Sequence, residues 1–155
     1  MHKIKKAIIP VAGLGTRMLP ATKAIPKELL PIIDKPLVQY IVEEAIEAGI
    51  QEIIFITRSG KEAIENHFDV NFELEKALKI SGKNKILKSI RDIIPKNLKI
   101  TSIRQENPKG LGDAILCAEH IIKKEPFAVL LPDELLMSNS KKNDLSEMLS
   151  QFNET

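Results

Sequence analysis

The chain has only one cysteine, Cys117, among its 155 residues. One thiol cannot close an internal disulfide bond, so we expect a reducing compartment, by default the cytoplasm. No apolar run is long enough to span a bilayer, and the apolar segment near the N-terminus is too short for a signal peptide. We therefore expect no membrane partner. The three histidines show no spacing typical of metal ligands, so we assign them structural or solvated positions.

The chain also lacks a large excess of positive or negative charge. The formal net charge is only +2, and cations are spread along the chain. A nucleic-acid-binding surface would concentrate its cations, so we expect no nucleic-acid partner. Internal repeats and low-complexity tracts are absent from the sequence. A chain of this length buries roughly 70% of its unfolded surface, enough for one domain.

The apolar residues that are present alternate between two periodicities. Residues 5–11, 52–57, 98–103 and 127–131 have the continuous apolar character of buried strands. Helical spacing is found in residues 36–48, 60–67, 110–123 and 144–152, and residues 69–95 read as two helical pieces broken near Gly82 and Asn84. This order predicts an α/β fold: a Rossmann-like sandwich whose mostly parallel sheet is flanked by helices.

In a parallel α/β sheet, ligands bind at the carboxyl ends of the strands. Three segments should meet at that edge. They are the loop after the first strand, residues 104–112 after the third strand, and residues 132–134 after the fourth. We expect the chemistry of the protein to lie there.

The first of these segments, PVAGLGTRMLPATKAIPKELLP at residues 10–31, carries glycines, cations and prolines. It is not a dinucleotide fingerprint, because Met18 stands where the third glycine should be, and it lacks the GxxxxGK[ST] pattern of mononucleotide loops. Glycine backbone can nevertheless approach phosphate closely, and Arg17 and Lys27 can neutralise its charge. The residues alone leave two interpretations open: a phosphate-binding cradle, or a strand-to-helix turn with solvated cations.

The whole segment AGLGTRMLPATKAIPKELLPIIDKPLVQY resembles the signature of the sugar-nucleotide pyrophosphorylases, G-x-G-T-R-x-x-P-x-T-K followed by P-K-E-x-L-P. The resemblance continues in AGIQEIIFIT, IENHFD, the RQ and KGLG of residues 104–112, and the LPD of residues 131–133. It therefore covers essentially the whole chain. The text ATKAIPKELLP and the inserted residues 69–95 favour the uridylyl branch, with a thymidylyltransferase-type enzyme as the alternative.

The resemblance implies a Mg²⁺-dependent reaction in which UTP and glucose 1-phosphate give UDP-glucose and pyrophosphate. It also implies roles for residues that match the family motifs. Backbone at Ala12 and Gly13 would lie against base and ribose, and the turn of Gly15, Thr16 and Arg17 would hold the triphosphate. Arg17 and Lys27 would be the catalytic cations, Glu28, Gln105 and Gly110 would contact the base, and Asp133 would bind Mg²⁺.

Two departures from the family pattern matter. Asp113 stands where the family usually has the histidine of KGLGHA. Family members also run to nearly twice this length, so we expect residues 1–155 to be the nucleotide-binding part of a single nucleotidyltransferase domain, incomplete at its C-terminus. A nucleotide-binding fragment without turnover is the alternative to an active enzyme. For a full-length family member the resemblance implies a homo-oligomer.

Overall fold

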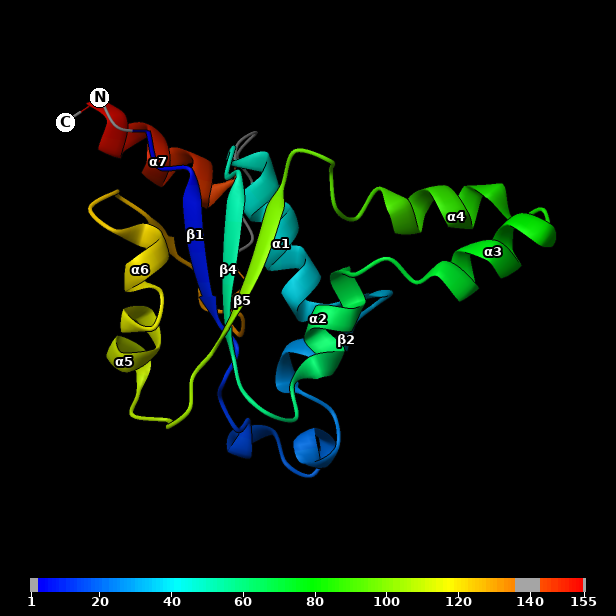
Figure 1. Ribbon diagram of the computed structural model, residues 1–155, viewed down its shortest axis with the longest axis horizontal. Helices are drawn as coiled ribbons and strands as arrows, with labels where there is room; N and C mark the ends of the chain where they lie inside the picture. Colours follow the sequence, from blue (N-terminus) through cyan, green and yellow to red (C-terminus); the bar gives the residue numbers. More distant parts are fainter. Residues whose placement is uncertain (1–2, 136–142, 155) are drawn as a thin grey trace.

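The computed structural model describes residues 3–135 and 143–154. Its centre is a parallel sheet in the order β5-β4-β1-β6 (Figure 1). The strands are β1 (Lys6–Pro10), β4 (Glu52–Thr57), β5 (Lys99–Arg104) and β6 (Ala128–Val129). The predicted α/β class and the parallel sheet are confirmed, and the carboxyl ends of all four strands lie at one edge.

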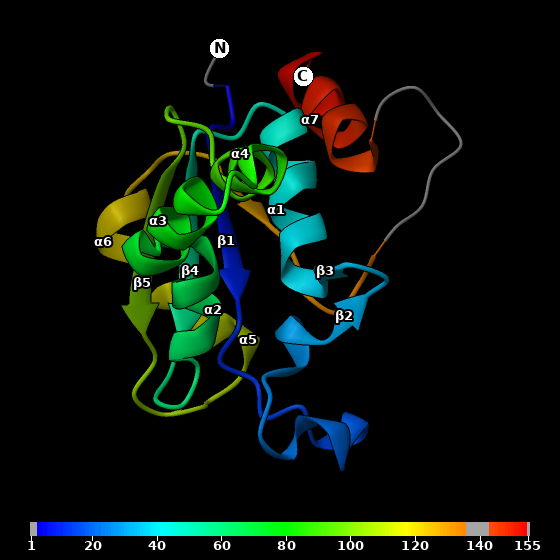
Figure 2. The same ribbon diagram turned by 90° about the vertical axis from the view of Figure 1, so that its right-hand side faces the viewer.

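Helices cover both faces of this sheet (Figures 1 and 2). On one face lie α1 (Leu37–Glu47), α2 (Glu62–Phe68) and α7 (Asp144–Glu154); on the other lie α5 (Leu111–Leu116) and α6 (Glu119–Ile122). Ile9 and Phe55 pack under the first group, whereas the neighbouring Ile8 and Ile54 pack under the second. This two-sided burial explains why the central strands are continuous apolar runs.

Two predicted elements are shorter in the structure than in the sequence pattern. The predicted helix 110–123 is two helices, α5 and α6. Between them Ala118 N donates to Ile115 O at 3.0 Å, a three-residue spacing that tightens the turn. Ala114, Ala118 and Ile122 all remain buried, so the break preserves the apolar face. The predicted strand 127–131 is assigned only over Ala128–Val129, although Leu130 N still donates to Ile8 O at 3.0 Å. Strand length depends on the partner strand as well as on the apolar run.

The segment between α2 and β5 forms a helical arm that extends away from the sheet (Figure 1). It consists of α3 (Phe72–Ile80) and α4 (Asn84–Arg91). Gly82 adopts φ +69° at the turn, and the side chains of Arg91 and Glu75 pair at 2.6 Å. The predicted break into two helical pieces is confirmed.

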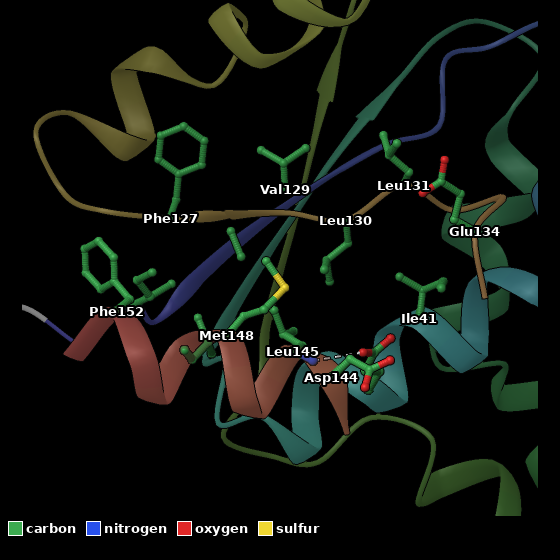
Figure 3. A pocket seen from close by; sticks show the side chains of 14 residues that line it. Ile41, Phe127, Val129, Leu130, Leu131, Glu134, Asp144, Leu145, Met148 and Phe152 are labelled. Atoms are coloured by element: carbon green, nitrogen blue, oxygen red, sulfur yellow. Dashed lines mark hydrogen bonds between the residues drawn. The ribbon is translucent and has the colours of Figure 1, made fainter. Parts of the chain in front are cut away.

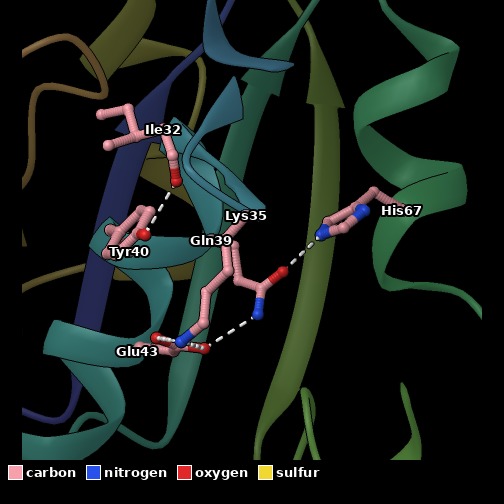
Figure 4. A network of polar contacts seen from close by, with 6 residues as sticks. All are labelled: Ile32, Lys35, Gln39, Tyr40, Glu43 and His67. Atoms are coloured by element: carbon pink, nitrogen blue, oxygen red, sulfur yellow. Dashed lines mark hydrogen bonds and ion pairs between the residues drawn. The ribbon is translucent and has the colours of Figure 1, made fainter. Parts of the chain in front are cut away.

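A hairpin that the sequence pattern did not reveal, β2 (Pro31–Ile32) and β3 (Lys35–Pro36), joins the loop after β1 to α1. A polar network fixes it in place (Figure 4). Lys35 Nζ pairs with Glu43 at 2.8 Å, Gln39 Nε2 donates to Glu43 at 2.8 Å, and Gln39 Oε1 lies 2.9 Å from His67 Nε2. Because Gln39 Oε1 can only accept, His67 Nε2 must donate. Burial lowers the pKa of His67 below its ordinary 6.5.

An apolar groove of about 450 Å³ runs between β6 and α7 (Figure 3). The predicted helical segment 144–152 corresponds to α7, and its apolar side chains differ in exposure. Leu145 and Leu149 are buried in the core, whereas Met148 and Phe152 line the groove and are partly exposed. No helix in the described part of the chain is long and apolar enough to cross a membrane.

Candidate functional site

The loop after β1 is built from three short 3₁₀ turns, η1 (Thr16–Met18), η2 (Ala21–Lys23) and η3 (Lys27–Leu29), at the carboxyl edge of the sheet (Figure 1). Gly15 has φ +69°, and a Cβ there would lie 3.2 Å from Lys27 Cβ and 3.3 Å from Thr22 Cβ. Thr22 Oγ1 donates to Gly15 O at 2.7 Å. The turn therefore needs glycine for its backbone angle and for space, and the hydrogen bond from Thr22 stabilises it.

The start of the loop continues the sheet before it turns away. Val11 N donates to Ile56 O at 2.8 Å, so the chain still follows β4 one residue beyond β1. Ala12 is buried, and the exposed Gly13 has Lys27 Cε as the nearest neighbour of a hypothetical Cβ, at 3.8 Å. Exposed backbone at Gly13 thus lies beside the Lys27 side chain. A phosphate-binding loop requires such a combination of open backbone and a cation.

The two residues predicted to handle phosphate and metal contact each other across 106 positions of sequence. Lys27 Nζ lies 2.7 Å from Asp133 Oδ2, and both side chains are mostly shielded from solvent. The hydrogen bond from Lys27 is the main reason why the pKa of Asp133 is below its ordinary value, and the charge of Arg17 contributes less. The fold therefore brings Lys27, from the loop after β1, into contact with Asp133, which follows β6, and the charge of Arg17 acts on Asp133 more weakly.

Glu28, the next residue, is wholly buried and does not face solvent. Its Oε2 pairs with Lys61 Nζ at 2.7 Å, and Lys61 is itself only 5% exposed. Glu28 Oε1 has no hydrogen-bond partner among the described residues. A direct contact between Glu28 and a nucleotide base would require the loop to shift, so this role stays a prediction. Lys61 was not predicted as a partner of the site, because the sequence shows it only as a residue of the predicted helix 60–67.

Gln105 extends β5 by one residue, because its N–H donates to Thr57 O at 2.8 Å. Its side chain is 6% exposed and turns toward the start of α5. Nε2 lies 2.7 Å from Asp113 Oδ2 and 3.5 Å from Gly110 O. Gly110 has φ +105°, a conformation that favours glycine. Asp113, which departs from the family pattern, is therefore the partner of Gln105, a residue predicted to contact the base. Nothing in the sequence indicated this pairing.

A small polar hollow of about 360 Å³ adjoins these residues. It is lined by Arg104, Glu106, Asn107, Lys109, Asp113 and Cys117. As for metal ions, no group of three or more His, Cys, Asp or Glu side chains in residues 3–135 and 143–154 could hold one.

Residues 6–155 match a protein family described as nucleotidyl transferase. Among curated proteins, the chain is 56% identical over 153 residues to the UTP–glucose-1-phosphate uridylyltransferase of Haemophilus influenzae, covering 97% of this chain and 52% of that protein. It is 54% identical over 156 residues to the enzyme of the same description from Escherichia coli K12, covering 99% and 52%. The chain spans about half the length of the curated relatives it matches.

Solved structures give the same result for the fold. A UDP-glucose pyrophosphorylase from Acinetobacter baumannii superposes with a TM-score of 0.95 at 51% identity, covering 98% of this chain and 53% of that one. A UTP-bound UGPase from the same organism gives 0.96 at 51% identity, with the same coverage. A UDP-glucose pyrophosphorylase complexed with UDP-glucose gives 0.81 at 46% identity, covering 97% and 53%.

Proposed function

The chain belongs to the nucleotidyl transferase family, and from this membership we propose that it carries the nucleotide-binding part of a UTP–glucose-1-phosphate uridylyltransferase. The observation that carries the proposal is the contact of Lys27 with Asp133 beside the glycine-containing turn, next to which Arg17 stands in the chain. A triphosphate needs such a cluster of cations and open backbone, and a solvated surface turn does not. We extend the proposal to residues 1–155 as one part of a single domain.

In the proposed reaction, a phosphate oxygen of glucose 1-phosphate attacks the α-phosphorus of UTP. The bond between that phosphorus and the bridging oxygen breaks, and pyrophosphate leaves with its electron pair. The attacking oxygen already belongs to an ionised phosphate, so no side chain has to remove a proton. The protein contributes position and charge neutralisation. Arg17 would neutralise the departing pyrophosphate, and Lys27 would reach the reacting phosphates, while backbone at Gly13, Gly15 and Thr16 would hold the chain of phosphates.

Asp133 fits a Mg²⁺ ion that arrives with the nucleotide. Mg²⁺ is commonly held by one or two carboxylates together with substrate phosphates, and Asp133 is a carboxylate at a strand end beside the proposed phosphate site. The ion would neutralise negative charge on the phosphate oxygens. Lys27 Nζ contacts Asp133 Oδ2 at 2.7 Å. A bound triphosphate gives Lys27 a second anionic partner, and Asp133 then becomes available.

Gln105 and Gly110 would recognise the base, with the Ala12 backbone alongside. Uracil carries a donor at N3, whereas cytosine carries an acceptor there, so an acceptor from the protein discriminates between them. Glu28 would join this contact only after a shift of the loop that covers it. A cytoplasmic location and a homo-oligomeric full-length enzyme also stay predictions.

Isothermal titration calorimetry of the chain with Mg²⁺ and either UTP, dTTP, CTP or ATP tests the base assignment. We expect UTP to bind more tightly than CTP and ATP. A preference for dTTP over UTP would favour the thymidylyltransferase alternative, and equal affinity for all four would leave only a general triphosphate site. Release of pyrophosphate from UTP and glucose 1-phosphate then separates an active enzyme from a nucleotide-binding fragment.

A further inference from the structure

We propose that Asp113 is a positioning residue that turns the amide of Gln105 so that its oxygen faces the nucleotide base. Asp113 would thereby set the preference for a base with a donor at N3. The inference rests on the proposed function, because it assumes that the base lies against Gln105.

The contact between the two side chains allows only one orientation of the amide. The Asp113 carboxylate can only accept hydrogen bonds, so the Gln105 atom that lies 2.7 Å from Oδ2 must be the nitrogen. The same nitrogen lies 3.5 Å from Gly110 O, which also can only accept. Turning the amide over would place its oxygen against both acceptors. Asp113 and Gly110 therefore fix a side chain that would otherwise present either end to a ligand.

The orientation leaves Gln105 Oε1 available. No hydrogen bond among the described residues uses this atom, and it is not one of the fully buried polar atoms that lack a partner. Gln105 also stands at the correct edge of the sheet. Its N–H bonds to Thr57 at the end of β4, and the adjacent Ile56 bonds to Val11, which precedes Ala12. Gln105 and the Ala12 backbone, which is proposed to lie against the base, therefore stand at the same edge of the sheet.

An acceptor at this place selects by elementary hydrogen-bond chemistry. Uracil and thymine donate from N3 and complete the contact, whereas cytosine would oppose its own acceptor to Gln105 Oε1. A site built around a hydrogen bond rejects an analogue that leaves its polar group unpaired. Asp113 would never touch the nucleotide. It would act only through Gln105.

A simpler role for Asp113 gives a different expectation. The residue lies in the first turn of α5, where a carboxylate favours the helix by its charge alone. In that role, replacing it would lower stability and would weaken the binding of every nucleotide to the same extent. The ratio of UTP affinity to CTP affinity separates the two roles, because the triphosphate contacts are common to both ligands.

The test is calorimetry with UTP and CTP on the wild type, Asp113→Asn and Asp113→Glu, with melting temperatures recorded for each. Asp113→Asn keeps the shape but can donate to Gln105 Oε1, so the affinity ratio should fall roughly tenfold, about the effect of one hydrogen bond. Asp113→Glu keeps an acceptor and should retain most of the ratio. In a Gln105→Leu background, Asp113→Asn should leave the ratio unchanged. An Asp113→Asn ratio equal to that of the wild type would overturn the proposal, and so would the same loss in the Gln105→Leu background.

A modified nucleotide tests the contact without any substitution in the protein. N3-methyl-UTP lacks the donor, so the wild type should bind it roughly tenfold more weakly than UTP. Equal binding of the two would overturn the proposal even if the Asp113 variants fail to fold. If the wild type shows no preference for UTP over CTP, the uridylyl assignment itself fails. A wild-type preference that survives Asp113→Asn instead rejects only the role of Asp113.

Discussion

Replacing Lys61 by methionine should destabilise the protein far more than removal of an ordinary surface cation. The ammonium of Lys61 is the partner of Glu28 at 2.7 Å, and the side chains are 7% and 0% exposed. Methionine has a similar length and no charge, so the substitution leaves a carboxylate buried beneath the loop without a counter-charge. Breaking a buried ion pair from one side costs about 3–5 kcal/mol.

The expected cost is large relative to the whole stability, because domains unfold with about 5–15 kcal/mol. For a chain of this size, 1 kcal/mol lowers the melting temperature by about 2–4 °C, so Lys61→Met should melt about 6–20 °C below the wild type. The double variant Glu28→Gln/Lys61→Met removes both charges and should recover much of that loss, since neutral replacement of a buried pair is often tolerated.

Lys35→Met is the matched control. Lys35 also pairs with a carboxylate, Glu43, at 2.8 Å, but the two side chains are 37% and 32% exposed. Exposed pairs contribute at most about 1 kcal/mol. Thermal unfolding followed by circular dichroism measures all of these variants. The reasoning is refuted if Lys61→Met and Lys35→Met lower the melting temperature equally, or if the double variant is no more stable than Lys61→Met.

Two further predictions concern Arg17 and His67. In a full-length enzyme, Arg17→Ala should lower the rate of pyrophosphate release from UTP and glucose 1-phosphate about a hundredfold, because it removes a preorganised charge, with a smaller loss of UTP affinity; near-normal turnover of that full-length variant would contradict the role. His67 has a pKa lowered by burial, so the unfolded chain takes up a proton more readily, and stability should fall as the pH drops below the unfolded value of 6.5. Urea unfolding should show this fall in the wild type and a smaller one in His67→Gln; identical pH dependence would rule out His67 as its source.

The sequence predicted best the elements that are buried against the sheet, because burial requires apolar residues at defined positions. Strand β4 is covered on both faces, so every residue from Ile53 to Thr57 is buried, and its apolar run marks its bounds. Helix α1 ends near Gly49, which adopts φ +89° past its last turn. The extent of β6 and the break between α5 and α6 depend on the pairing and packing of distant segments, which a local pattern does not contain.

Some contacts of the candidate site could also be predicted from the sequence, and others could not. The meeting of Lys27 and Asp133 follows from topology, because both come after parallel strands that lie side by side. The contacts of Lys61 and Asp113 could not be predicted, since both residues lie in segments of helical spacing, 60–67 and 110–123, and the departure from the family pattern at Asp113 does not reveal which residue it contacts. Only the tertiary contacts, across 33 positions from Glu28 to Lys61 and eight from Gln105 to Asp113, show that they are structural parts of the site.

These contacts have a common consequence for ligand binding. Lys27, Glu28 and Gln105 each have a charged partner from another segment, so contacts within the protein hold these side chains in place. Side chains that are already held in place lose less conformational entropy when a ligand binds. At Lys27 the existing contact acts in the opposite direction, because the proposed contact with a phosphate would have to replace the one with Asp133. A nucleotide that captured Lys27 alone would leave the Asp133 carboxylate facing its phosphates, and like charges repel there. The arrangement therefore favours a triphosphate that brings its own cation, since only then do Lys27 and Asp133 both retain a partner of opposite charge.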